Sequence, residues 1–113
     1  TYTRELTTAD ARIDWGKDAA EIERLVRAMQ PWPKAWSILE GRRLAVLACD
    51  ISQEPSTQPP GTINVSARPP RVATGTTDLV LLRVQPEGKR EMAAEDWARG
   101  ARLPHGARFA PVE

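Results

Sequence analysis

An amphipathic segment that runs straight into a Pro-Trp-Pro corner is the feature that most constrains how this chain folds. Within residues 20–29 the apolar side chains recur at i, i+3, i+4 and i+7 and therefore share one helix face: Ile22, Leu25, Val26 and Met29. Pro31 and Pro33 follow at once, and a proline fixes its own φ and keeps the preceding residue out of the helical region. We therefore predict one packing helix that is capped by Asp18 and ends near Gln30.

Tryptophans gather around this corner, and we expect them to be buried. Trp15 ends a segment that is predicted to be extended, residues 12–15, while Trp32 and Trp36 lie on either side of the second proline. Large aromatic side chains beside an apolar helix face usually join the core. Asp14 is interpreted as a hydrogen-bonding anchor for the corner. The alternative is that an exposed tryptophan such as Trp36 stacks on nucleic-acid bases.

The chain after the corner has the pattern of a small β protein. Five short apolar or alternating segments separated by turn residues are predicted to be strands: residues 36–39, 44–51, 61–65, 72–74 and 78–85. Residues 52–60, rich in Pro, Ser and Gln, are predicted to be a loop. Residues 94–99 are predicted to be a short helix that carries Trp97 and ends at Gly100.

Five short antiparallel strands must hide their edges, and closure into a small barrel is a common solution. The predicted fold is therefore mainly β with flanking helices: a five-stranded oligonucleotide-binding-like barrel preceded by one helix and followed by a short helix. Residues 1–35 would form the leading segment and the packing helix, and residues 36–113 the barrel. At 113 residues the two parts are expected to make a single domain.

Single residues and absent motifs argue against several kinds of site. Cys49 is the only cysteine, so an internal disulfide is excluded and a reducing compartment is expected. We interpret it as a small buried hydrophobe rather than a nucleophile, because the only histidine, His105, lies far along the chain. One cysteine and one histidine do not make a zinc site, and no glycine-rich phosphate loop is present. The sequence therefore indicates no catalytic, cofactor-binding or metal-binding residues.

The ends and the charges of the chain add three further expectations. No segment is long and apolar enough to span a membrane, and no signal peptide is visible. A chain that begins at Thr1 rather than at a methionine is expected to be part of a longer protein. Charge is nearly balanced, 16 Lys and Arg against 15 Asp and Glu, but the later part of the chain is rich in arginine. This uneven distribution fits weak binding to a polyanion, with scattered solubilising arginines as the alternative.

Several motifs that occur in a fixed order are more specific than the composition. They are Arg12-Ile13-Asp14-Trp15, Pro31-Trp32-Pro33-Lys34-Ala35-Trp36, Pro60-Gly61-Thr62-Ile63, Val72-Ala73-Thr74-Gly75 and Gln85-Pro86-Glu87-Gly88-Lys89-Arg90. Together they resemble the C-terminal domain of the methionyl-tRNA formyltransferases. The resemblance covers nearly the whole chain, and the Pro-Trp-Pro-x-Ala-Trp and Gln-Pro-x-Gly-Lys blocks in combination are highly specific.

The resemblance implies a role beside a catalytic domain. The full enzyme of this family transfers a formyl group from 10-formyltetrahydrofolate to the methionine of initiator methionyl-tRNA. The folate and the catalytic Asn, His and Asp belong to an N-terminal catalytic domain, so this chain is expected to hold no cofactor and to be inert alone. The implied partners are initiator tRNA and that N-terminal domain, and a cytoplasmic monomer is expected.

The same resemblance implies contacts to the tRNA backbone without base readout. The best candidates for phosphate contacts are two pairs of cations at turns: Arg42, Arg43, Lys89 and Arg90. Whether the two pairs share one face depends on the fold.

Two departures and two alternatives accompany this interpretation. Thr76-Thr77 stands where the family often has Asp-Gly, and Ala93 replaces a frequent serine that would cap the last helix. One alternative is a structural C-terminal domain of a sugar-nucleotide formyltransferase that binds no RNA. The other is an unrelated protein-interaction barrel.

Overall fold

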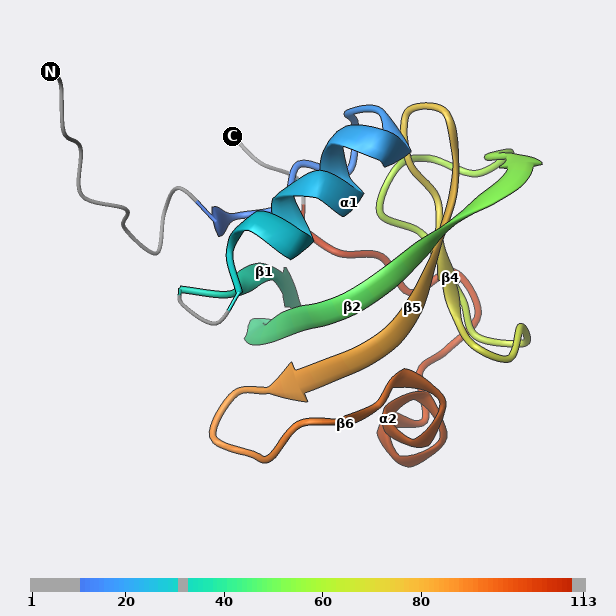
Figure 1. Ribbon diagram of the computed structural model, residues 1–113. Helices are drawn as coiled ribbons and strands as arrows, with labels where there is room; N and C mark the ends of the chain where they lie inside the picture. Colours follow the sequence, from blue (N-terminus) through green and yellow to red (C-terminus); the bar gives the residue numbers. More distant parts are fainter. Residues whose placement is uncertain (1–10, 31–32, 111–113) are drawn as a thin grey trace, which may run out of the picture.

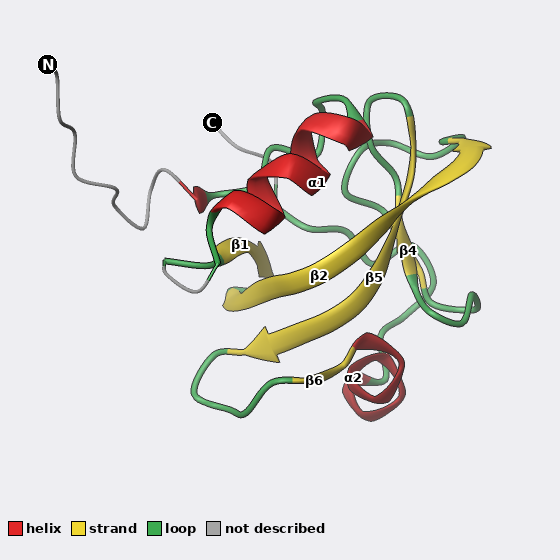
Figure 2. Cartoon of the chain, in the orientation of Figure 1, coloured by secondary structure: helices red, strands yellow, loops and turns green. Residues whose placement is uncertain are grey.

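A strongly bent antiparallel sheet with a helix before it and a short helix after it makes up the molecule (Figures 1 and 2). The computed structural model describes residues 11–30 and 33–110, so the predicted burial of Trp32 lies outside the described residues. The elements are α1 (Ala19–Ala28), β1 (Ala35–Leu39), β2 (Arg42–Pro55), β3 (Ile63–Asn64), β4 (Arg71–Val72), β5 (Thr77–Pro86), β6 (Met92–Ala93) and α2 (Ala94–Ala101).

The two long strands β2 and β5 form the middle of the sheet. Its order is β1-β2-β5-β4-β3, and β6 pairs with β5. The register steps from Val46↔Val84 to Ala48↔Arg83 and then to Cys49↔Leu81, so that Leu47 on β2 and Leu82 on β5 are each skipped. Such bulges increase twist and bend a strand. They account for the sharp curvature of β2 and β5 in Figure 1.

Helix α1 packs as its sequence pattern predicts. Ile22 and Val26 are buried in the main core, and Leu25, half-buried, touches both that core and the smaller cluster around Met29. The side chain of Asp18 accepts a hydrogen bond from the Ala20 N–H at 3.1 Å, which confirms the predicted N-cap. The helix ends at Ala28 with Met29 as its C-cap, close to the predicted end.

The turn before β5 docks on the start of α1. The Gly75 N–H donates to the Lys17 carbonyl at 3.0 Å. The Thr76 hydroxyl oxygen accepts from the Ala19 N–H at 3.0 Å and lies 3.2 Å from the Asp18 carboxylate. Thr76 therefore supplies a second side-chain cap for α1.

The tail after α2 fills the space between the two end strands of the sheet. The Ile63 N–H of β3 donates to the Ala107 carbonyl at 2.8 Å, and the Ala110 N–H donates to the Ile38 carbonyl of β1 at 2.8 Å. Phe109, which is 1% exposed, stacks on Trp15 with ring centroids 5.0 Å apart. The tail thus joins β1 and β3 through backbone hydrogen bonds and seals the core beneath them.

Tryptophan burial agrees with the sequence prediction where it can be checked. Trp15 is 3% and Trp36 8% exposed, and the Trp15 indole N–H donates to the Ser37 hydroxyl at 3.0 Å. Asp14 accepts from the Gly16 N–H at 3.0 Å. Asp14 therefore anchors the turn that leads into α1, whereas the sequence predicted an anchor for the Pro-Trp-Pro corner.

Three details of the predicted fold are corrected. The sheet has six strands instead of five, because the two-residue β6 is too short to leave a pattern. Residues 52–55 belong to β2 instead of a loop, since Pro55 pairs with Thr77 through the backbone without any apolar alternation. Helix α2 passes Gly100 and ends at Ala101, and its C-cap Arg102 takes the left-handed conformation with φ 50°. The ladder of strands does not close, so the oligonucleotide-binding barrel stays a prediction.

The absence of a side-chain N-cap on helix α2, predicted from Ala93, is confirmed. Ala93 occupies the N-cap position and makes no side-chain hydrogen bond to the helix. Glu95 and Asp96 in the first turn offset part of this loss through their favourable interaction with the helix dipole.

Candidate nucleic-acid interface

The turn after β5 is fixed by the side chain of Gln85. The Lys89 N–H donates to the Pro86 carbonyl at 3.0 Å, and Gly88 has φ 75°, the conformation that a type II turn requires at its third residue. The Gln85 amide donates to the Lys89 carbonyl at 3.0 Å, and its oxygen accepts from the Lys34 ammonium at 2.8 Å. The Gln-Pro-x-Gly-Lys block is thus a rigid turn that presents Lys89 at a set position.

The turn between β1 and β2 lies beside it. Glu40 and Gly41 both have positive φ, 51° and 78°, which is the type I′ geometry of a two-residue hairpin. Arg43 and Glu87 tie the two turns together: the Arg43 N–H donates to the Glu87 carboxylate at 3.2 Å, and the Glu87 N–H donates to the Arg43 carbonyl at 3.0 Å. Because β2 and β5 are antiparallel, the start of one meets the end of the other.

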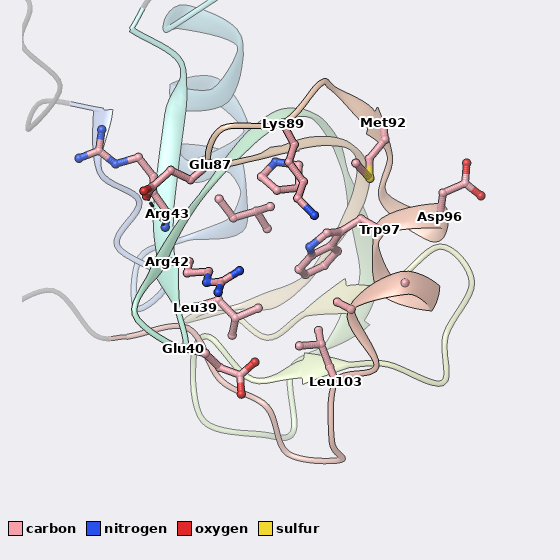
Figure 3. A pocket seen from close by; sticks show the side chains of 14 residues that line it. Leu39, Glu40, Arg42, Arg43, Glu87, Lys89, Met92, Asp96, Trp97 and Leu103 are labelled. Atoms are coloured by element: carbon pink, nitrogen blue, oxygen red, sulfur yellow. Dashed lines mark hydrogen bonds between the residues drawn. The ribbon is translucent and has the colours of Figure 1, made fainter.

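This arrangement brings three of the four predicted cations together. Arg42, Arg43 and Lys89 line one groove of about 620 Å³ between the two turns and α2. Arg90 is exposed next to Lys89 but is not part of the groove lining. In Figure 3 the side chains of Arg42 and Lys89 reach toward the hollow, whereas Arg43 turns outward.

Arg43 is the most constrained of the three cations. Its guanidinium lies over the ring of the buried Trp36, 4.1 Å from the ring centroid. Arg42 and Lys89 make no ion pair or side-chain hydrogen bond with any residue in the ranges 11–30 and 33–110. These two cations can therefore bind an external anion without breaking an interaction within the described part of the fold.

Carboxylates also line the groove and balance its formal charge. They are Glu40, Glu87 and Asp96. Glu87 is engaged by the Arg43 N–H, and Asp96 pairs with Arg99 at 2.9 Å. Binding of phosphate at this end would therefore depend on individual cations that reach outward, and not on a strong net field.

Three residues beside the candidate cations were not identified as site residues from the sequence. Lys34 and Gln85 line a smaller cavity of about 190 Å³ together with Arg43 and Trp36, and Trp97 lines the larger groove. The Pro-Trp-Pro-Lys and Gln-Pro-x-Gly-Lys blocks contain the first two, so the motifs carried the signal. Their hydrogen bond, however, joins residues 51 positions apart and is visible only in the fold.

Cys49 is held in its neutral form. The pKa of its thiol is raised to about 12, mainly by burial and also by the nearby carboxylates of Glu23 and Asp50, against the opposing effect of Arg27. A thiol with such a pKa is a poor nucleophile. Cys49 is half-buried and packs against the main core from β2, so it is a small core-lining hydrophobe that is less buried than predicted.

We expect the Cys49 thiol of the native chain to react with iodoacetamide at pH 8 far more slowly than that of the urea-unfolded chain, by about 100-fold or more. Because the folded pKa is above the ordinary value of 9.0, the unfolded state loses its proton first, and stability falls as the pH rises from about 9 to 12. Mass spectrometry of the alkylated chain measures the rate. Equal rates with and without urea would contradict the assigned burial.

Metal-binding and membrane-spanning features are absent from the described residues. These residues contain no group of three or more His, Cys, Asp and Glu side chains close enough to hold a metal ion. No helix among them has the length and apolar character needed to cross a membrane.

The fold and the site define a class: a small β domain with one helix before the sheet, one helix after it, and exposed cations on two neighbouring turns at one end. Residues 5–102 match the family model described as "Formyl transferase, C-terminal domain". The chain belongs to this family.

Curated relatives agree with the assignment, and a solved structure has a similar fold. The chain is 45% identical over 110 residues to a methionyl-tRNA formyltransferase of Roseiflexus sp. (strain RS-1), 44% over 112 residues to one of Corynebacterium glutamicum (strain R) and 40% over 108 residues to one of Thermobifida fusca. Each match covers 96% of this chain and 34–36% of the relative, so the chain spans about a third of their length. An alanine-substituted variant of HypX from Aquifex aeolicus has a similar fold, with a TM-score of 0.67 at 15% identity over 96% of this chain and 19% of that one.

Proposed function

We propose that this chain is the C-terminal, tRNA-positioning domain of a methionyl-tRNA formyltransferase. The observation that carries the proposal is the convergence of Arg42, Arg43 and Lys89 on one groove at one end of the sheet, in a chain whose curated relatives bear that name. Formyl transfer from 10-formyltetrahydrofolate to initiator methionyl-tRNA belongs to the N-terminal catalytic domain of the full cytoplasmic enzyme, and this chain is inert alone.

Positioning requires interactions that hold the tRNA without reading its sequence. Exposed cations on rigid turns satisfy this, because phosphates recur at regular spacing whatever the bases are. Arg42 and Lys89 supply cations that are not engaged within the described fold. Arg43 is oriented by Trp36, and Arg90 is an exposed cation next to Lys89 outside the groove lining.

The proposal predicts a specific defect when Arg42 and Arg43 are both replaced by alanine in the full-length transferase. We expect the KM for initiator tRNA to rise about tenfold, equivalent to about 1.4 kcal/mol shared by two exposed cations. The slope of log affinity against log salt should decrease in magnitude by roughly 0.7–0.9 for each phosphate that is no longer neutralised. Turnover at saturating tRNA and the KM for the folate should change little, because the interaction that is removed is present in both the ground state and the transition state.

Steady-state titrations with tRNA at two salt concentrations measure both quantities. The matched control replaces Arg24 and Arg68, two exposed arginines outside the groove lining, and removes the same charge. If both double variants keep the wild-type KM at both salt concentrations, the arginines serve only solubility. A structural C-terminal domain, as in the sugar-nucleotide formyltransferases, would then be the better account.

A further inference from the structure

The groove lined by Arg42 and Lys89 also has an apolar wall that includes Trp97. Phosphate binding alone does not require such a wall. We propose that the groove binds one unpaired nucleotide of the RNA, with the phosphate at Arg42 and Lys89 and the base against Trp97. The inference rests on the proposed function and deepens it, because it adds a single-stranded element to a surface otherwise expected to bind the backbone alone.

The first observation is an apolar wall. Aliphatic, thioether and aromatic side chains from β1, β2, β6, α2 and the tail form it: Leu39, Leu44, Met92, Trp97 and Leu103. The hollow measures about 620 Å³, within the range of about 300–1,000 Å³ that small-molecule sites occupy. A row of phosphates needs only cations on a surface, whereas a planar base needs a space of this kind to enter.

The second observation is a set of hydrogen-bond donors around that wall. The side chains of Arg42 and Lys89 make no ion pair or hydrogen bond with the described residues. The indole N–H of Trp97 likewise donates to no residue within 11–30 and 33–110, although the side chain is only 8% exposed. The indole nitrogen itself is open to solvent, so this N–H can donate to an acceptor that enters the groove. Figure 3 shows the ends of Lys89 and Arg42 turned toward the hollow beside the Trp97 ring.

The carboxylates of the lining do not cancel these donors. Asp96 points away from the hollow in Figure 3 and pairs with Arg99, and Glu87 accepts from the Arg43 N–H. Glu40 lies on the other side of the groove from Lys89 (Figure 3). An anion therefore meets two cations at one side of the hollow, next to an apolar wall.

A nucleotide in single-stranded RNA has this combination of groups. It joins a phosphate to a flat base with acceptor atoms on its edges, and proteins commonly take up unpaired bases against aromatic and apolar side chains. A base in a duplex stays inside the stack and cannot enter the hollow, so a duplex would engage the rim cations only.

The test compares two RNAs that are titrated onto this chain on a common scale of phosphate concentration: an unpaired tetranucleotide and a blunt duplex long enough to stay paired. Three variants are used. Lys89→Ala removes a cation in the groove, Arg90→Ala removes the adjacent cation outside it, and Trp97→Phe removes the indole N–H while keeping an aromatic ring. Fluorescence anisotropy of end-labelled RNA gives the affinity, and thermal unfolding verifies that each variant folds.

We expect Lys89→Ala and Trp97→Phe each to weaken tetranucleotide binding about tenfold, and Arg90→Ala to weaken it less than twofold. Duplex binding should respond equally to Lys89→Ala and Arg90→Ala and not at all to Trp97→Phe. Were a folded Trp97→Phe variant to bind the tetranucleotide as the wild type does, the nucleotide site would be overturned while the proposed function stood. Failure of tRNA itself to bind the full-length transferase through these cations would overturn both.

If Trp97→Phe does not fold, the indole N–H resonance of Trp97 in the wild-type chain replaces it as the readout. A tetranucleotide must shift that resonance and inorganic phosphate alone must not, and the absence of this difference overturns the site.

Discussion

Replacing Gly75 by alanine is expected to destabilise the fold by about 3 kcal/mol or more, at the upper end of what overpacking costs. A Cβ at this position would lie inside the van der Waals distance of the Gly16 carbonyl oxygen and within 3.0 Å of the Lys17 carbonyl oxygen. Both obstacles are backbone atoms, so no side-chain rotation relieves them. The turn before β5 would have to move away from the start of α1, which would break the Gly75 to Lys17 hydrogen bond and remove the cap from Thr76.

Chemical denaturation of the variant and the wild type measures the change in the free energy of unfolding. Gly100→Ala is the matched control, because a Cβ there meets nothing within 4 Å and the residue lies inside helix α2. That change should stabilise the chain, by up to about 1 kcal/mol, since alanine is the better helix former. A Gly75→Ala variant as stable as the wild type would show that the turn does not dock on α1 as described.

Replacing Phe109 by alanine is expected to cost about 3–5 kcal/mol, a large part of the stability of a domain of this size. Phe109 is 1% exposed and stacks on Trp15 at 5.0 Å. Its N–H donates to the Gly61 carbonyl at 2.9 Å within the tail that joins β3 to β1. Removal of the ring would leave a cavity under both end strands, so the tail would detach from the core.

The same tail provides the control for Phe109→Ala. His105 is exposed, and His105→Ala should change the free energy of unfolding by less than about 0.5 kcal/mol, as is usual for surface positions. Thermal melts of the two variants, together with proteolysis of the tail, distinguish the outcomes. Similar melting temperatures for both would mean that the tail is not part of the folded core.

The local elements of this fold were predictable because their causes are local. The spacing of Ile22 and Val26, the cap at Asp18 and the two prolines fix α1 within a residue or two of its observed ends. The hairpin at Glu40-Gly41 and the turn at Gly88 also follow from nearby residues. The extension of β2 to Pro55 and the tail that joins β1 to β3 could not be predicted in this way, because their backbone partners lie far along the chain.

The candidate site was predictable in its residues but not in its arrangement. Arg42, Arg43 and Lys89 stood out as cations at turns, but only the antiparallel pairing of β2 with β5 brings them to one groove. The unpartnered indole of Trp97, seen among the described residues, carried no sequence signal, because a tryptophan on a short amphipathic helix is usually a core residue. The sequence motif did not distinguish Arg90 from Lys89. In the structure Lys89 lines the groove and Arg90 does not.

The most direct test of tRNA binding at this groove is amide chemical-shift mapping of the isotope-labelled chain during titration with initiator tRNA. We expect the perturbed amides to cluster in residues 39–43 and 85–92, the two turns that carry the candidate cations, and the shifts to fade as salt is raised. Strand β4, which pairs with the earlier part of β5, and the segment before it carry their own exposed or partly exposed cations, Arg71 and Arg68. Perturbations centred there, or shifts that do not respond to salt, would contradict the claim that this groove holds the tRNA.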